Sequence, residues 1–348
     1  MPYSMAKRVN IWESYPWRVV ILALTWLVVI SVLHYWFNGE SDRRQVIKMG
    51  YMPVITNLAA PLLDHASSQY ESEYRFKAIK FASFAEMAEA LRNDEIQAAF
   101  IIAPLSIVLR QQGEDVKVVY IGNRHESTMV ARKSLKAKSI HDLAGATVAV
   151  PMRYSGHNLG MLKLIAEAGL EDKIRLVEMN PPDMASALAA GALDAYFVGE
   201  PFAAQTLRSG DADRIFYVED VWPNFICNLL LVKNRFIQTH PPAVQQLVEG
   251  AVRSGLWAEH NIAQASEIAS KYWGQPQALV AYALNTPQRR IVYNRYVPVD
   301  EEMQYMARLM VRFDLLEDQS VEGLVDDRFA KRADVTGIAG ADSILQKP

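Results

Sequence analysis

The residues most able to do chemistry in this chain lie in the segment PMRYSGHN, residues 151–158. Ser155 or Gly156 would cap the helix whose apolar pattern follows, and His157 and Asn158 would lie in its first turn. The free N–H groups and the dipole of a helix start attract anions, and a histidine there can donate a hydrogen bond. The segment is therefore a ligand-binding helix start or, alternatively, an ordinary capped helix with a surface histidine.

A second candidate is the loop Gly199-Glu200-Pro201, which follows an apolar stretch at 195–198. Glycine allows close approach of a ligand to the backbone. Glu200 would accept a hydrogen bond from a ligand or cap the next helix. Pro104 has the corresponding place earlier in the chain and would only shape a wall. Phe84, at a predicted helix start, would pack over a ligand or fill the core.

A third group lies near residue 222. Trp222 would close a cleft or plug a hinge, and Asn224 offers hydrogen-bond donors and an acceptor. Arg124 would pair with an anionic ligand or remain a solvated loop charge.

Signatures of catalysis are missing from the sequence. It contains no GxSxG, HExxH, Walker or GxGxxG motif. Cys227 is the only cysteine, so no intramolecular disulfide or CxxC metal site can form, and we expect a buried, inert thiol. We predict no catalytic residue, metal ligand or cofactor, and the net charge of −3 gives no case for nucleic acid as a partner.

The elements that position these residues are indicated by an internal repeat. MAEALRNDEIQAAFIIAP begins at Met87, and MASALAAGALDAYFVGEP begins 97 residues later at Met184. Each copy predicts a helix, a turn, a short strand and a Pro-bearing loop. Ligands bind beyond the carboxyl ends of strands in α/β sheets, so two such lobes facing each other would form a ligand cleft.

The surrounding pattern alternates strands with helices, which predicts an α/β fold with mostly parallel sheets. We expect the chain to cross between lobes near residues 130 and 228, and to be mostly helical from Ala243 to its end. Trp257, Tyr272 and Trp273 are expected core anchors. The predicted strands span residues 45–51, 74–81, 98–102, 116–121, 127–132, 147–150, 174–178, 195–198, 214–218 and 228–233.

The N-terminal region contains 19 residues, Val19 to Phe37, without Asp, Glu, Lys or Arg. This length suits a transmembrane helix, and aromatic residues stand at both ends, as they do at membrane interfaces. We expect a retained anchor with a cytoplasmic N-terminus; a cleaved signal peptide and a buried core helix are the alternatives. The HYWFNGES exit lacks the small-residue pattern of a cleavage site.

Several motifs together resemble a known family. They are GYMPVITNLAAPLL (50–63), PMRYSGHN (151–158), NPPDMASALAAGALDAYFVGEPF (180–202) and LMVRFDLLED (309–318). They resemble the nitrate/sulfonate/bicarbonate class of ABC-importer substrate-binding proteins, most closely its nitrate- and bicarbonate-binding branch. His157 and Gly199 match ligand-contacting positions of that branch. Phe84 falls where the nitrate binders have a Trp. Pro223 falls where they have a Lys, so this chain lacks the cation that would pair with nitrate.

The resemblance implies a two-lobed type II periplasmic binding protein fold that closes on a small ligand. The ligand would be anionic, and the partners would be a permease and a cytoplasmic ATPase. The expected divisions are 1–18 cytoplasmic, 19–37 anchor, 38–44 linker, 45–130 and 229–348 lobe one, and 131–228 lobe two. A ligand sensor of the same fold is the first alternative. A pyrimidine-precursor binding protein or enzyme is the second, although that branch resembles a cysteine-rich motif that this chain lacks.

Overall fold

The computed structural model describes residues 16–38 and 44–345 and divides into two compact units, residues 1–44 and 45–348. The first unit contains helix α1 (Pro16–Asn38). Its stretch Trp17–His34 has a mean hydropathy of 2.0, and none of it is buried. The helix is therefore long and apolar enough to cross a membrane, although a signal sequence would satisfy the same criteria.

The second unit is built on two five-stranded sheets. The first has the order β2-β1-β3-β10-β4 and the second the order β7-β6-β8-β5-β9. In the first sheet the strands are β1 (Val46–Tyr51), β2 (Arg75–Lys80), β3 (Ala98–Ile102), β4 (Val116–Ile121) and β10 (Asn228–Lys233). In the second they are β5 (Ser127–Arg132), β6 (Thr147–Val150), β7 (Arg175–Glu178), β8 (Ala195–Gly199) and β9 (Ala212–Tyr217). The predicted α/β fold class is confirmed, and the strands agree with those expected to within two residues at each end.

The two sheets have the same design. Each sheet contains one strand that is antiparallel to its neighbours. This strand is β10, between β3 and β4, in the first sheet and β5, between β8 and β9, in the second. Met49 pairs with Ala98 in the first sheet, and Val148 pairs with Ala195 in the second. Ala98 and Ala195 are 97 residues apart, so the sequence repeat corresponds to an architectural repeat.

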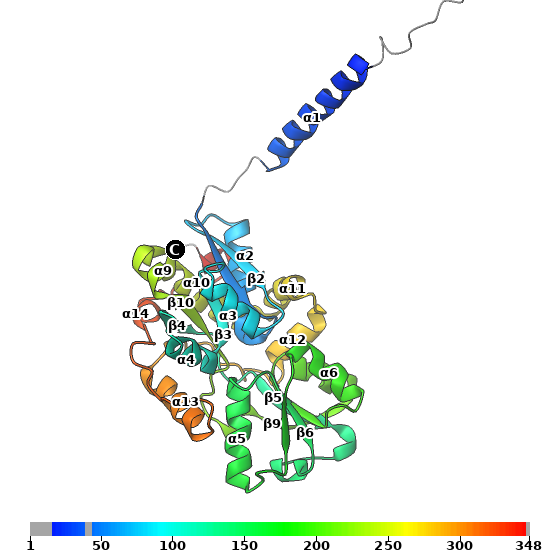
Figure 1. Ribbon diagram of the computed structural model, residues 1–348, viewed down its shortest axis with the longest axis vertical. Helices are drawn as coiled ribbons and strands as arrows, with labels where there is room; N and C mark the ends of the chain where they lie inside the picture. The colour runs from blue at the N-terminus through cyan, green and yellow to red at the C-terminus, as the bar shows by residue number, and fades with distance from the viewer. Residues whose placement is uncertain (1–15, 39–43, 346–348) are drawn as a thin grey trace, which may run out of the picture. The chain divides into compact units, whose positions relative to one another are not determined.

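The chain passes twice between the sheets, from β4 to β5 and from β9 to β10. Figure 1 shows the consequence: the middle of the chain, in green, forms the region around β5, β6 and β9, while earlier and later segments form the region around β1 to β4. Each antiparallel strand is the first strand after a passage. The residues that precede β5 and β10 therefore lie where the two halves of the unit join.

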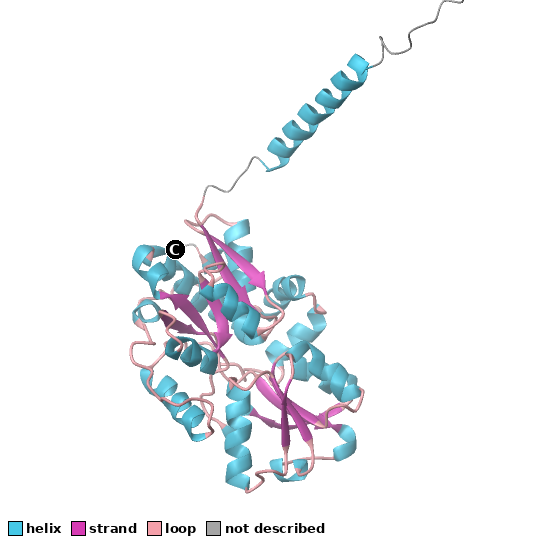
Figure 2. Cartoon of the chain, viewed as in Figure 1, coloured by secondary structure: helices cyan, strands magenta, loops and turns pink. Residues whose placement is uncertain are grey.

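Helices cover both sheets (Figure 2). The helices of the first two thirds of the unit are α2 (Ala59–Gln69), α3 (Phe84–Arg92), α4 (Ala103–Gln111), α5 (Gly156–Ala168), α6 (Pro181–Ala189), α7 (Phe202–Ser209) and α8 (Val218–Val221). The remainder are α9 (Asn234–Thr239), α10 (Pro241–His260), α11 (Ile262–Trp273), α12 (Gln277–Asn285), α13 (Asp300–Arg312) and α14 (Arg328–Lys331). Short 3-10 turns lie at Ile55–Asn57, Lys133–Leu135, Ile140–Leu143 and Ala341–Ile344.

Helix boundaries follow from local chemistry. Ser83 accepts a hydrogen bond from the backbone N–H of Glu86 and caps α3. Ser155 caps α5 in the same way through the N–H of Asn158. Gly169 ends α5 with a φ of 64°, a left-handed conformation that favours glycine. The predicted helix starts at Phe84 and near His157 are thus confirmed.

The expectation of a mostly helical C-terminal region is correct for α10 to α13 and wrong for residues 286–299 and 313–327, which contain no helix. The first of these segments instead lies against the passage to β5, where Val292 forms a bridge with Arg124. The backbone of this segment forms hydrogen bonds with a distant part of the chain and not within a helix, so the spacing of apolar residues could not predict its conformation. Trp257 and Trp273 are buried as expected, and Tyr272 is partly buried.

One apolar cluster joins the two halves of the unit. It contains residues of β3, such as Ala99, together with residues of the second half, such as Tyr196 and Leu159. The backbone N–H of Ile55 also donates to the carbonyl of Glu200 across the junction, at 2.8 Å. The structure is therefore a closed arrangement of the two halves.

Candidate functional site

Four buried polar side chains meet where the two passages enter the sheets. Glu126 and Ser127 stand at the start of β5, Cys227 stands directly before β10, and His157 projects from the first turn of α5. None of the four is more than 5% exposed. We refer to these four residues as the hinge cluster.

Ser127 lies at the centre of the hinge cluster. Its hydroxyl donates to Oε1 of Glu126 at 2.8 Å and lies 2.9 Å from Nε2 of His157. The Cys227 thiol donates to Oδ1 of Asn228 at 3.2 Å and lies beside the Glu126 carboxyl. Ligand-type atoms of Glu126, His157 and Cys227 all lie within 4.8 Å of one another. A carboxyl, an imidazole and a thiol thus lie together, and the first two are bonded to one hydroxyl.

His157 is buried among aromatic rings, so the alternative of a surface histidine is wrong. Its ring makes edge contacts with Phe197 and Phe225, at centroid distances of 4.9 and 5.5 Å. Burial lowers the pKa of His157 to about 3, so the imidazole is neutral at physiological pH. Its Nδ1 has no hydrogen-bond partner among the described residues. The ring can therefore accept or donate one further hydrogen bond.

Gly199 pairs with Ser127 of β5, so Gly199 and the following Glu200 lie against the hinge cluster. The backbone N–H of Glu200 donates to Oε2 of Glu126 at 2.8 Å. A Cβ at Gly199 would stand 2.8 Å from the same oxygen, so only glycine leaves room for the carboxylate. The group that approaches the Gly199 backbone closely is thus the buried Glu126 carboxyl of the protein itself.

The Glu200 carboxyl is fully engaged inside the protein. Oε1 accepts from Thr128, and Oε2 accepts from the N–H of Ala204 in the first turn of α7, each at 2.8 Å. The capping alternative for Glu200 is therefore observed. Burial, opposed by these hydrogen bonds, raises its pKa to about 7. Burial also raises the pKa of Glu126. The site contains two carboxyl groups that hold protons unusually well.

Arg290 supplies positive charge to this region from the irregular segment 286–299. It pairs with Glu219 at 2.8 Å, stacks on the ring of Tyr217, and donates to Thr128 at 3.1 Å and to the carbonyl of Ser127. Its charge opposes the upward pKa shifts of Glu126 and Glu200. Arg290 therefore bridges the two halves while it stabilises the acidic groups at their junction.

The first half of the unit contributes amide side chains to the same region. Nδ2 of Asn228 donates to Oδ1 of Asn57 at 2.7 Å, and Asn57 donates to the carbonyl of Met52. Asn123 donates to the carbonyl of Ile55, while its Oδ1 has no partner among the described residues. The junction is thus lined by donors and acceptors from both halves, as a binding site for a small polar molecule requires.

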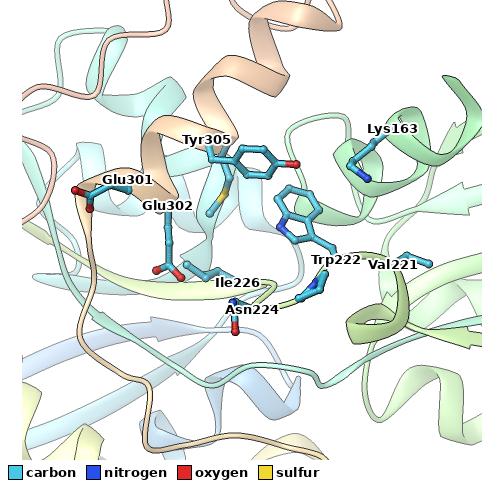
Figure 3. Close-up of a pocket in the computed structure, with 10 residues that line it drawn as sticks. Lys163, Val221, Trp222, Asn224, Ile226, Glu301, Glu302 and Tyr305 are labelled. Atoms are coloured by element: carbon cyan, nitrogen blue, oxygen red, sulfur yellow. The ribbon is translucent and has the colours of Figure 1, made fainter. Parts of the chain in front are cut away.

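Trp222 and Asn224 line a separate pocket of about 330 Å³. Figure 3 shows the rings of Trp222 and Tyr305 between α5, which carries Lys163, and α13, which carries Glu301 and Glu302. The Phe225 ring lies between this pocket and the hinge cluster, because it contacts both Trp222 and His157. The six candidates Phe84, Pro104, Ser155, Gly156, Asn158 and Glu200 are buried, and Asn158 donates to the carbonyl of Arg153.

Arg124 has a structural role in place of the anion contact considered from sequence. Its guanidinium is 2% exposed and forms a bidentate pair with Glu302, at 2.6 and 3.0 Å. It also donates to the carbonyls of Asn224 and Arg295. These contacts tie the passage before β5 to α13.

Sequence reasoning missed Glu126, Ser127 and Cys227. Each lies immediately before or at the start of a strand that follows a passage. The same reasoning that selected Glu200, proximity to a strand end, applies to these positions once the antiparallel direction of β5 and β10 is known. Cys227 was expected to be buried, and it is, but not isolated from histidine.

A model of the NMT1-like family matches residues 40–271. A "Putative aliphatic sulfonates-binding protein" of Bacillus subtilis (strain 168) is 22% identical over 317 residues, which cover 88% of this chain and 94% of that protein.

Solved structures share the fold. A zinc-bound ligand-binding component of an ABC-type import system from Staphylococcus aureus has a TM-score of 0.76 at 21% identity, covering 84% of this chain and all of that one. The periplasmic nitrate-binding protein NrtA from Synechocystis PCC 6803 has a TM-score of 0.75 at 14% identity, covering 84% and 88%. The desulfurization enzyme DszB has a TM-score of 0.59 at 14% identity, covering 83% and 99%, so this fold also occurs in an enzyme.

Proposed function

From the premise that this chain belongs to the NMT1-like family, we propose that it is an extracytoplasmic solute-binding protein of an ABC importer. It encloses a small ligand between its two lobes and delivers it to a permease driven by a cytoplasmic ATPase. The support is the family, the resemblance to the nitrate/sulfonate/bicarbonate class, and the relatives named for such binding.

One observation carries the proposal: equivalent strand ends of two equivalent sheets face a common junction lined by buried polar groups. Ser127 and His157 come from the second half, and Asn57 comes from the first. Polar groups are costly to bury unless they are bonded, so a junction rich in them is suited to recognising a polar ligand. The backbone hydrogen bond from Ile55 to Glu200 supports the proposal that the lobes close over such a ligand.

We propose that the ligand is a small oxyanion or sulfonate, as the relatives' names suggest, held at the start of α5. The proposed ligand-binding residues are Phe84, Pro104, Ser155, Gly156, His157, Asn158, Gly199, Glu200, Trp222 and Asn224. His157 has the strongest case among them, because it is buried and has an unused ring nitrogen. Trp222 and Asn224 would contact a ligand only if it extended past Phe225.

We keep the lobes 45–130 with 229–348 and 131–228 as a proposal; their bounds differ from the sheets at residues 127–130, which pair in the second sheet, and at Asn228, which pairs in the first. We further propose that α1 is a retained membrane anchor, with the segment before it in the cytoplasm. Such tethering would keep the binding protein beside its permease and raise its local concentration. Intact-mass analysis of the protein from membranes tests this, because a cleaved signal peptide would leave a chain lacking residues 19–37.

A binding role is favoured over catalysis by the state of Cys227. The thiolate is the nucleophilic form of cysteine. Burial and the neighbouring Glu126 raise the pKa of Cys227, so in the metal-free protein the thiol is protonated and a poor nucleophile. Turnover of any ligand by the purified protein would contradict this part of the proposal.

The proposal is tested by a thermal-shift screen of the full chain in detergent, followed by calorimetry. The panel contains nitrate, nitrite, bicarbonate with and without calcium, alkyl and aryl sulfonates, phosphonates and pyrimidines. A ligand specific for the folded state adds about 2.7 kcal/mol of stability at a hundredfold excess over its dissociation constant. A hit that is lost in His157→Ala supports the proposal. A folded protein that responds to none of the panel contradicts it.

A further inference from the structure

The hinge cluster combines the three side-chain types that zinc prefers. Zinc in proteins is bound by Cys sulfur, His nitrogen and Asp or Glu oxygen, and three protein ligands leave a fourth position open. Glu126, His157 and Cys227 offer one atom of each type. They come from three separate parts of the chain, so the tertiary fold alone brings them together.

The geometry requires little movement. Bond lengths of 2.0 to 2.3 Å around a tetrahedral zinc ion place neighbouring ligand atoms about 3.5 Å apart. The three atoms lie within 4.8 Å of one another, so each must move by an ångström or less. The Ser127 hydroxyl, hydrogen-bonded to Glu126 and His157, lies between two of the three ligand groups. Rotation of that hydroxyl about its Cα–Cβ bond would vacate the position.

The neighbouring groups also suit a bound cation. Nδ1 of His157 has no hydrogen-bond partner among the described residues, so this ring nitrogen can bind a cation without breaking a hydrogen bond. The second oxygen of Glu126 is oriented by the Glu200 N–H, as the carboxylates of metal sites are by outer hydrogen bonds. Glu200 itself is bonded to Thr128 and Ala204 and adds a further carboxyl nearby.

We propose that Glu126, His157 and Cys227 form a binding site for a divalent cation of the zinc class at the hinge between the lobes, and that the Cys227 thiol and the Glu126 carboxyl release their protons to solvent as the cation binds. This inference deepens the proposed function, because the cation would supply the positive charge for an anionic ligand at its open position. The sequence offered no metal site, since the three residues lie 31 and 70 positions apart along the chain.

The sole cysteine makes a decisive experiment possible. Full-length protein in detergent is freed of metal with EDTA, exchanged into chelator-free buffer and titrated with Co²⁺ without oxygen. A thiolate-to-cobalt charge-transfer band can arise only from Cys227, because the chain has no other cysteine. We expect this band to appear at one equivalent and to disappear when Zn²⁺ displaces the cobalt. Folded wild-type protein that gives no band, and no heat with Zn²⁺, would overturn the proposal.

Variants assign the ligands. Changes around a metal's ligands commonly weaken binding by about 10–100-fold, so loss of a ligand should weaken zinc binding by more than this. Cys227→Ser should remove the band, and Glu126→Gln should keep the band with weaker binding. His141→Gln, at an exposed histidine outside the cluster, is the matched control and should bind as wild type does. If Cys227→Ser does not fold, the wild-type band still decides, because it has a single possible source.

The metal site and the proposed transport function fail in different ways. The ligand panel is repeated with the metal-free and the zinc-loaded protein. A ligand that binds equally well to both, in a protein that gives no cobalt band, contradicts the metal site and leaves the binding function standing. A cobalt band in a protein that binds no panel ligand supports the metal site and contradicts the proposed cargo class.

Discussion

Ser127 and Asn228 occupy equivalent positions in the two sheets. Each is the first residue of the antiparallel strand that follows a passage, and Ser127 pairs with Gly199 while Asn228 pairs with Ile102. Those partners are 97 residues apart, which is the offset of the sequence repeat. Ser127 lies in the hinge cluster of the second half, and Asn228 bonds Asn57 within the first half. The duplicated architecture therefore places two different polar residues on opposite sides of one junction.

Replacing each of the two glycines of α5 with alanine should have opposite effects on the stability of the protein. A Cβ at Gly156 would lie 2.7 Å from the Phe225 ring, whereas at Gly160 the nearest atom is 3.4 Å away, an ordinary contact. Gly156→Ala should destabilise by about 1–3 kcal/mol through overpacking. Gly160→Ala should be neutral or stabilise by up to about 1 kcal/mol through helix propensity. Urea unfolding of both variants measures the difference, and equal effects would contradict the tight packing at Gly156.

The Arg124–Glu302 pair should contribute far more to stability than a surface pair does. Glu302→Gln leaves a guanidinium that is 2% exposed without its charged partner. Breaking a buried pair costs about 3–5 kcal/mol, and since Glu302 is partly exposed we expect about 1–3 kcal/mol. The matched control is Glu167→Gln, which breaks the exposed pair with Lys163 and should cost less than about 1 kcal/mol. Chemical denaturation of both variants provides the test.

The raised pKa of Glu200 predicts that the free energy of unfolding falls as the pH rises. Its pKa is raised from 4.5 to about 7 in the folded protein, so the folded state holds the proton more tightly than the unfolded state does. The stabilisation is complete below pH 4.5 and is lost as the pH rises through 7, with a size of about 3 kcal/mol. Melting temperatures with EDTA between pH 5 and pH 8 measure it.

Glu200→Gln is the control for that pH dependence. Its amide does not titrate in this range, so part of the fall in stability between about pH 5 and pH 8 should disappear. Some dependence should remain, because burial also raises the pKa of Glu126. An unchanged profile in Glu200→Gln would show that the proton lies on another group.

His157 and Trp222 should differ in their effect on ligand affinity, because the Phe225 ring separates them. For a ligand found in the panel, His157→Ala should weaken binding at least tenfold, through the loss of about 1.4 kcal/mol or more. Trp222→Ala should change the affinity of a small ion by less than threefold. Calorimetry of both variants checks this, with circular dichroism to confirm that each is folded. Equal losses would mean that the ligand reaches both sites.

Local chemistry accounts for the parts of the site that could be predicted. Ser155 was recognisable as a helix cap, and Gly199-Glu200 as a strand-end loop, since each depends on residues within four positions along the chain. The buried neighbours of His157 were not recognisable. Phe197 and Phe225 are 40 and 68 positions away, so no pattern in the segment 151–158 distinguished a buried histidine from an exposed one.

The sequence by itself determined the repeat, the alternation of strands and helices, and the apolar N-terminal helix. These follow from periodicity and residue type, which act over a few positions. Only the tertiary structure decided that Glu126, His157 and Cys227 meet around Ser127. That meeting depends on two antiparallel strands entering their sheets at a common junction, and the relative direction of distant strands is set by packing of the whole unit.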